Sequence, residues 1–221
     1  QATGERLAQT VKSYTERAER GAMIDHAFHI TVTDTGVPEF ASDLKTLIEA
    51  GHRSIKIVTT YNIQLNDREV LETVAQARAH GALICVHAEN DAIIARAKDA
   101  LIEAGQLRPL DHAASRPRMA EVEAISRMCR LAEYLGQPVM IFHVSTPEGA
   151  QIVREARAAG TPVWAETCPH YLFMTQDILD KPGVEGAKWM CSPPQRTSAD
   201  QDALWAALDA GDLQIVSSDH A

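Results

Sequence analysis

Two kinds of hydrophobic pattern alternate along this chain. Amphipathic segments with apolar residues at helical spacing, several of them closed by glycine, predict helices. Short continuous apolar runs between them predict strands. The predicted helices cover about residues 5–20, 39–50, 66–81, 90–104, 118–135, 146–160 and 198–211. The predicted strands lie at about 22–31 and within SIKIVTTY, ALICVHAEN, PVMIFHVST, PVWAE and LQIVSSDH.

Side chains with capping character mark the start of three of these helices. Asn66 is followed three residues later by Glu69, which is the spacing of a capping box. Residues 146–147 are Thr-Pro, a pair that suits the N-cap and the first helical position. Ser198 and Gln201 predict the start of the last helix.

Strands and helices alternate along the whole chain, which implies a parallel α/β sheet. Four strands run into a polar residue that suits a metal site: Lys56, His87, His143 and Asp219. A doubly wound sheet would build a ligand site from few strands at one switch point. The strand ends of a (β/α)8 barrel instead converge on one face. We therefore expect an α/β fold of the (β/α)8 TIM-barrel type, present as an incomplete segment.

The two histidines and the aspartate indicate a metal site on that face. A single histidine at a strand end is more often a hydrogen-bonded structural residue, and an aspartate in SSDH is often a turn or N-cap residue. Two histidines at one edge with a matching aspartate favour metal binding, because imidazole nitrogen and carboxylate oxygen suit Zn²⁺ and related ions. Asp219 could also act as a general base beside a metal-bound water.

Lys56 is the unusual member of this set. It is flanked by Ile55 and Ile57, and an unpaired ammonium group is costly to bury. It could form a salt bridge, extend its amine to solvent, or react with CO₂ to give a carbamate that bridges two metals. The spacing does not decide between these interpretations. Tyr61, Ser192 and His170 are weaker candidates that would ordinarily be loop residues, and the charged residues of the helices are interpreted as a solvated outer face.

Composition narrows the class of partner and compartment. The chain has 221 residues, 21 Lys and Arg against 30 Asp and Glu, and a net charge of −9, which argues against nucleic acid or an anionic membrane as the main partner. No apolar run approaches membrane-spanning length, and no secretory segment opens the chain. Cys85 and Cys129 lie within a strand and a helix and are expected to pack as small hydrophobic residues. The four cysteines include no C-x-x-C pair, so we expect a reducing, cytoplasmic location.

Several motifs in order along the chain resemble the dihydropyrimidinase/hydantoinase family of cyclic amidohydrolases. They are SIKIVTTY, VHAEN, SRPRMAEVEAI, FHVST, ETCPHYL, GAKWMCSPPQR and SSDH, and the resemblance covers essentially all 221 residues. It implies that 22–31 is the third strand of the barrel, so that the chain holds about strands 3–8. It also implies that residues 1–221 form one partial barrel domain, without the small β-sandwich of the family.

The resemblance implies a site with two divalent ions, usually zinc, with manganese as the alternative. A CO₂-derived carbamate on Lys56 would bridge the ions, His87 and His143 would bind one of them, and Asp219 would bind the other. A hydroxide between the metals would then attack the ring amide of a dihydropyrimidine or 5-substituted hydantoin and open it to an N-carbamoyl amino acid.

Further roles follow from the same resemblance. Tyr61 would stabilise the oxyanion, Ser192 would hold the cyclic amide through its backbone, and Asp219 would carry the proton to the leaving nitrogen. The resemblance also implies a homotetramer or homodimer.

Two alternatives remain open. One is an allantoinase or dihydroorotase, although the tyrosine of KIVTTY and the segment GAKWMCSPPQR favour dihydropyrimidinase-like substrates. The other is a non-catalytic scaffold relative, a class that has lost metal ligands which this chain retains. The family's H-x-H pair and the substrate segment beyond the last strand are not in these 221 residues. We therefore expect the chain to be a segment of a longer protein, and to be inactive alone because a partial barrel exposes two sheet edges.

Overall fold

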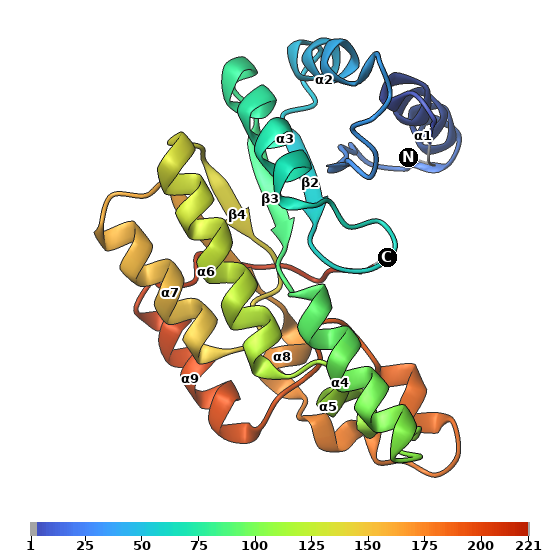
Figure 1. Cartoon of the computed structure of the whole chain (residues 1–221), viewed down its shortest axis with the longest axis vertical. Helices are drawn as coiled ribbons and strands as arrows, with labels where there is room; N and C mark the ends of the chain where they lie inside the picture. The colour runs from blue at the N-terminus through green and yellow to red at the C-terminus, as the bar shows by residue number, and fades with distance from the viewer. Residues whose placement is uncertain (1–3, 221) are drawn as a thin grey trace.

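The computed structural model describes residues 4–220, which contain one parallel six-stranded sheet covered by helices (Figure 1). The strands follow one another across the sheet in sequence order, and every neighbouring pair is parallel. A doubly wound sheet would reverse its direction of winding at a switch point. This sheet does not, so the predicted barrel-type winding is confirmed. The strands are β1 (Ile30–Thr31), β2 (Ser54–Val58), β3 (Leu83–His87), β4 (Val139–Ile141), β5 (Val163–Thr167) and β6 (Ile215–Val216).

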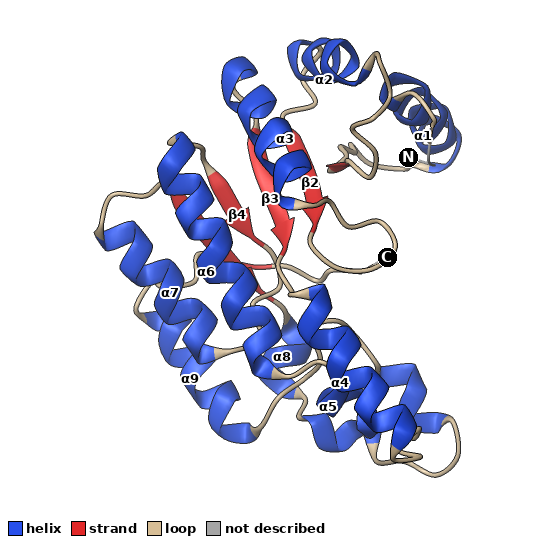
Figure 2. Cartoon of the chain, in the orientation of Figure 1, coloured by secondary structure: helices blue, strands red, loops and turns tan. Residues whose placement is uncertain are grey.

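The helices form an arc around the outer side of the sheet (Figure 2). This arc contains α1 (Leu7–Gly21), α2 (Phe40–Glu49), α3 (Asp67–His80), α6 (Arg118–Leu135), α7 (Pro147–Ala158) and α9 (Ser198–Asp209). The remaining elements lie beyond the carboxyl ends of the strands: α4 (Asp91–Glu103), α5 (Asp111–Ser115), α8 (Pro169–Phe173), η1 (Gln176–Leu179) and η2 (Glu185–Trp189). None of the helices in the described part of the chain is long and apolar enough to cross a membrane.

The two faces of the sheet bury different side chains. The outer face carries Ile84, Val86 and Ile141 into the large core shared with the helices. Cys85, which lies between Ile84 and Val86 in the chain, faces the inner side and forms a separate small cluster with Met140 and Phe142. Successive side chains of a strand point to opposite faces. The same alternation assigns His87, two residues after Cys85, to the inner face, together with Lys56, which lies beside Cys85 in the ladder.

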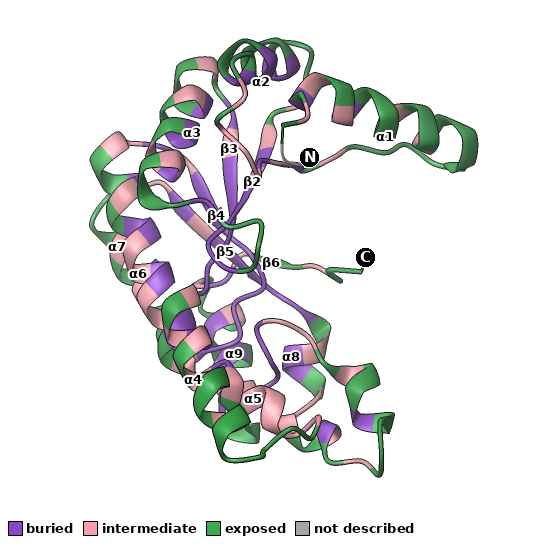
Figure 3. Cartoon of the chain, turned by 45° about the vertical axis from the view of Figure 1, so that its right-hand side comes forward, coloured by how far each residue is buried: buried purple, intermediate pink, exposed green. Residues whose placement is uncertain are grey.

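The sheet curves into a half ring that is open on one side (Figure 3). Its two edge strands are shorter than predicted. Of the strand expected at 22–31, only Ile30 and Thr31 pair with β2, and of LQIVSSDH only Ile215 and Val216 pair with β5. Each edge strand has a ladder partner on one side only, so fewer hydrogen bonds hold it extended.

The capping predictions are confirmed for two helices and wrong by one residue for the third. Asn66 and Glu69 form the capping box of α3, and Thr146 caps α7. The last helix, α9, is capped by Thr197 instead of Ser198. The Thr197 hydroxyl accepts a hydrogen bond from the Asp200 amide, and the Asp200 carboxylate accepts one from the Thr197 amide at 3.0 Å.

Cys85 and Cys129 pack as small hydrophobic residues, as predicted. They are 1% and 4% exposed and form no disulfide. Burial raises the pKa of Cys85 to about 11 and that of Cys129 to about 12, so both remain protonated thiols at neutral pH.

We predict that Gly186→Ala destabilises the protein. A Cβ at position 186 would lie 2.1 Å from the carbonyl oxygen of Leu179 and 3.0 Å from Cβ of Pro109, and overpacking of this kind costs about 1–3 kcal/mol. Gly21→Ala is the matched control, because a Cβ there meets nothing within 4 Å. Urea unfolding of the full-length protein should show a lower midpoint for the first variant only; equal midpoints would contradict the packing argument.

We also predict a pH-dependent contribution from Asp43, which joins α2 to the start of α1. Its carboxylate accepts hydrogen bonds from the Arg6 side chain and from the Ala8 amide, and these contacts hold its pKa below the ordinary value. A depressed pKa adds stability above the unfolded-state pKa of about 3.9, and this stability is lost as the pH falls through the lower, folded-state pKa. Asp43→Asn should therefore lower the free energy of unfolding at pH 7, and the difference should shrink in acid. A difference that stays constant down to pH 2 would refute this.

Candidate functional site

Three residues at the carboxyl edge of the sheet have a left-handed backbone. Tyr61 (φ 67°), His143 (φ 42°) and Asp219 (φ 47°) are the non-glycine residues with positive φ in the described part of the chain. Such a conformation costs of the order of 1–3 kcal/mol and clusters at functional sites, where the surrounding structure enforces it. All three belong to the predicted site.

The unusual backbone of His143 explains how its ring reaches the inner face. Phe142 packs in the inner cluster, so a regular strand would direct the next side chain outward. The positive φ interrupts that alternation, and the ring of His143 lies edge-on against His87, with centroids 4.5 Å apart. The structure thus brings the two predicted histidines together.

Both imidazoles are buried and neutral. Burial, together with the charges of Arg116 and Lys56, lowers the pKa of His87 to about 3. Burial also lowers the pKa of His143 well below its ordinary value, with Asp219 opposing this shift. A neutral imidazole keeps a free lone pair, which is the form that binds metal.

Lys56 lies in the middle of β2, two residues before the strand ends, so its predicted place at the strand end is wrong. The strand continues because Ile57 and Val58 extend the ladder with β3. The ammonium group lies 5.2 Å from the ring centroid of Phe142, on the inner face, and acts on the pKa of His87 and of His143. Lys56 is therefore directed toward the histidine pair.

The donor types in this region fit a divalent ion. Nδ1 of His143 is buried and has no hydrogen-bond partner among the described groups. Within residues 4–220, no three His, Cys, Asp or Glu side chains are grouped so that they could hold a metal ion. Lys56 could join His87, His143 and Asp219 as a ligand only after losing its positive charge, as it would in a carbamate.

Tyr61 and Ser192 lie together beside the histidines. The Tyr61 ring is 5.5 Å from that of His87. Burial raises the pKa of Tyr61 above its ordinary value, although the nearby side chain of Ser192 opposes this. Tyr61 therefore stays protonated and can donate a hydrogen bond.

The loop that carries Ser192 is held by two side chains from other parts of the fold and by one of its own. His112 Nε2 donates to the carbonyl of Cys191 at 2.7 Å, and the Tyr171 hydroxyl donates to the carbonyl of Pro193 at 2.6 Å. Gln195 closes the loop by donating to the Trp189 carbonyl at 2.8 Å. These contacts fix the backbone on both sides of Ser192.

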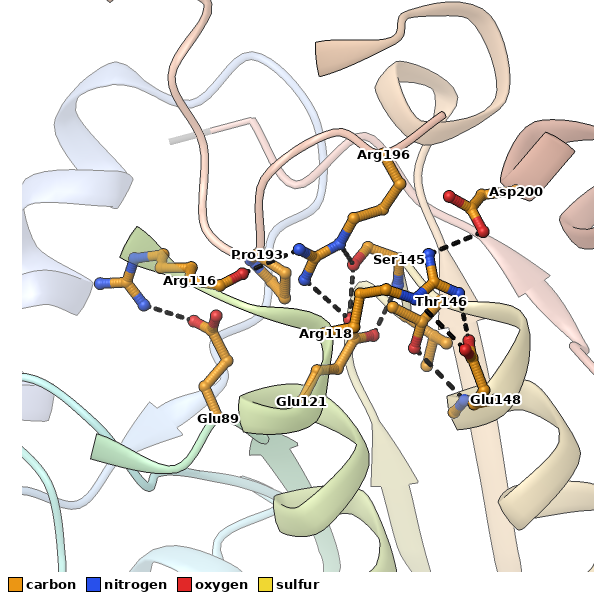
Figure 4. Close-up of polar contacts among 12 residues, drawn as sticks. Glu89, Arg116, Arg118, Glu121, Ser145, Thr146, Glu148, Pro193, Arg196 and Asp200 are labelled. Carbon is orange, nitrogen blue, oxygen red and sulfur yellow. Dashed lines mark hydrogen bonds and ion pairs between the residues drawn. The ribbon is translucent and has the colours of Figure 1, made fainter. Parts of the chain in front are cut away.

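Four charged residues behind the site are not among the site residues predicted from the sequence (Figure 4). Interpreting helical charged residues as a solvated face is wrong for Glu121, which is 1% exposed. A signal was present, because Glu121 shares one stripe of α6 with the buried residues Ile125 and Met128. The motifs VHAEN, SRPRMAEVEAI and CSPPQR contain all four: Glu89, Arg116, Glu121 and Arg196.

Known proteins resemble this chain over nearly its whole length, although no family model matches it. A D-hydantoinase of Geobacillus stearothermophilus is 37% identical over 218 residues, which cover 98% of this chain and 46% of that protein. A D-phenylhydantoinase of Escherichia coli is 38% identical over 218 residues, 98% of this chain and 47% of that protein. The crystal structure of dihydropyrimidinase from Brevibacillus agri NCHU1002 superposes with a TM-score of 0.94 at 35% identity, covering 98% of this chain and 48% of that one. The chain thus spans about half the length of these relatives.

We predict that His112→Leu loosens the Ser192 loop. The substitution leaves the carbonyl of Cys191 without its donor, and a buried polar group that loses its partner costs about 1–3 kcal/mol. Amide hydrogen exchange of the full-length protein should become faster for residues 189–194 and stay unchanged in α6. Unchanged exchange in the loop would show that His112 does not hold it.

Proposed function

Because this chain belongs to the dihydropyrimidinase and D-hydantoinase family, we propose that it forms part of the catalytic barrel of a metal-dependent cyclic amidohydrolase. The proposed reaction opens a dihydropyrimidine or 5-substituted hydantoin ring to an N-carbamoyl amino acid. The cytoplasmic location and the homodimeric or homotetrameric assembly stay predictions of the resemblance.

One observation carries this proposal. The strained backbones of Tyr61, His143 and Asp219 come from three separate places in the chain, and each follows a strand of the same parallel sheet. Strain is retained where the surrounding structure enforces it, and it marks sites at which side-chain direction matters. Here it accompanies two neutral histidine rings in contact.

The residues that would hold the metals are Lys56, as its carbamate, His87, His143 and Asp219. When bound, two divalent ions supply Lewis-acid polarisation of the amide carbonyl and lower the pKa of a water molecule to near neutrality. His87 and His143 suit this role because both are neutral and buried. Zinc is the proposed metal and manganese the alternative.

Three other functions fall to side chains and backbone of this chain. The protonated hydroxyl of Tyr61 would donate a hydrogen bond to the oxygen on which negative charge develops. The backbone of Ser192, in its braced loop, would hold the cyclic amide. The carboxylate of Asp219 would accept a proton from the attacking water and deliver it to the ring nitrogen as the C–N bond breaks.

The names of the relatives favour hydantoin and dihydropyrimidine rings over the alternatives. An allantoinase or dihydroorotase would use the same barrel edge with a different substrate pocket, and a scaffold relative would need no metal. The retention of the strained residues beside the histidine pair favours an enzyme over a scaffold.

The proposal is tested by measuring metal content and ring opening in the full-length protein that contains this chain. After purification with zinc and bicarbonate we expect two zinc ions per subunit, and ring opening of dihydrouracil or a 5-substituted hydantoin in preference to allantoin or dihydroorotate. Asp219→Asn should lower kcat by about 10²–10⁴-fold, the usual contribution of a positioned acid–base group.

Asp209→Asn, at the exposed end of α9, is the control and should leave kcat unchanged. A zinc-bound protein that opens none of these rings would refute the substrate class. A protein that binds no divalent ion would refute the metal mechanism and revive the scaffold alternative.

A further inference from the structure

Glu89 is a fully buried carboxylate that contacts the candidate ligand His87. It is 0% exposed, and its Oε2 atom lies 2.8 Å from Nε2 of His87 and 2.6 Å from Nη1 of Arg116. Its other oxygen, Oε1, is buried without a partner among the described groups. Oε2 of Glu89 thus contacts both His87 and Arg116.

We propose that Glu89, held in place by Arg116, is a positioning residue that fixes the proton and the ring orientation of His87. The inference rests on the proposed function, because it assigns His87 to the metal. It adds to that function a residue pair that sets the geometry of a ligand.

The hydrogen-bond inventory determines which ring nitrogen of His87 is left free. A carboxylate can only accept, so the contact with Glu89 requires the proton of the neutral imidazole to be on Nε2. Nδ1 then carries the lone pair. Metal-binding histidines generally donate their second nitrogen to a carboxylate or carbonyl in this way, and the partner orients the ring and raises its basicity.

Arg116 holds Glu89 in place, and its positive charge opposes the rise in the pKa of Glu89 that burial causes. Arg116 is 7% exposed, its guanidinium donates to Oε2, and its carbonyl accepts a hydrogen bond from Nη1 of Arg196 at 2.8 Å. The guanidinium carbon also lies 4.6 Å from the ring centroid of Tyr61. Arg116 thus contacts both the partner of His87 and the proposed oxyanion donor, and its backbone is anchored behind the site (Figure 4).

A second buried pair in the same region provides the structural comparison. Glu121 and Arg196 are 1% and 7% exposed, and they pair at 3.4 Å around the hydroxyl of Ser145. Neither side chain contacts His87 or Tyr61 among the contacts of the described residues. Substitution within this second pair should therefore change the stability of the protein and leave the geometry of His87 unchanged.

The test compares Glu89→Gln and Arg116→Gln with Glu121→Gln in the full-length protein. The measurements are the zinc dissociation constant, by competition with a chelator, and the midpoint of thermal unfolding. We expect all three variants to unfold at lower temperature. Only the first two should bind zinc more weakly, by about 10–100-fold, as is usual when the outer partner of a metal ligand is removed.

The double variant Glu89→Gln/Arg116→Gln completes a double-mutant cycle on zinc affinity. Because Arg116 acts through Glu89, the double variant should weaken zinc binding no more than the stronger single variant does, whereas independent effects would multiply. Glu89→Asp keeps the charge but shortens the side chain, and it gives a folded variant with intermediate affinity if Glu89→Gln does not fold.

The outcomes separate this inference from the proposed function. Equal zinc affinities for Glu89→Gln and Glu121→Gln, or multiplying effects in the cycle, would overturn the positioning role. A wild-type protein that binds zinc but opens no ring would refute the proposed activity, while the zinc comparison would still decide the role of Glu89. Absence of zinc binding in the wild type would overturn both.

Discussion

The parallel ladder from β2 to β5 is the constraint on which the rest of the structure depends. Its register places Lys56 beside Cys85 and Val58 beside His87, and the next pair places Cys85 beside Met140. Since the strands are parallel and stand in sequence order, their carboxyl ends meet at one edge. Residues that are separated by long helices in the chain therefore share one face, and a one-residue slip in register would turn each strand's inner side chains outward.

Strained backbone at this edge turns toward the inner face a side chain that a regular strand would direct outward. The left-handed backbone at His143 turns its ring inward immediately after a residue that already faces inward. This conformation persists because the segment is held on both sides. Phe142 donates its amide to the carbonyl of Val86, and Val144 donates to the carbonyl of Glu166. The ladder thus supports the conformation that the site requires.

The two histidines are neutral, whereas the layer of side chains behind them is charged. The two histidines are deprotonated because they are buried next to positive charge. Behind them, Glu89 and Glu121 are ionic partners of Arg116 and Arg196. Such pairs often add little net stability, because desolvation offsets their attraction. Their role here is to orient neighbouring groups, since Glu89 contacts the ring of His87 and Glu121 accepts a hydrogen bond from Ser145.

The sequence by itself determined the order of elements, the parallel sheet and most helix ends, because hydrophobic periodicity and capping are local properties. It also predicted Lys56, His87, His143 and Asp219 as site residues, from their places at or near the ends of apolar runs. The resemblance carried by its motifs supplied Tyr61 and Ser192, and the relatives confirm the family. The local pattern predicted edge strands that are too long, because the length of an edge strand depends on its partner strand. It also missed the buried charges at Glu89, Arg116, Glu121 and Arg196. Only the tertiary structure decided which charged side chains are buried and which face His143 presents, because burial and backbone strain arise from contacts between segments far apart in the chain.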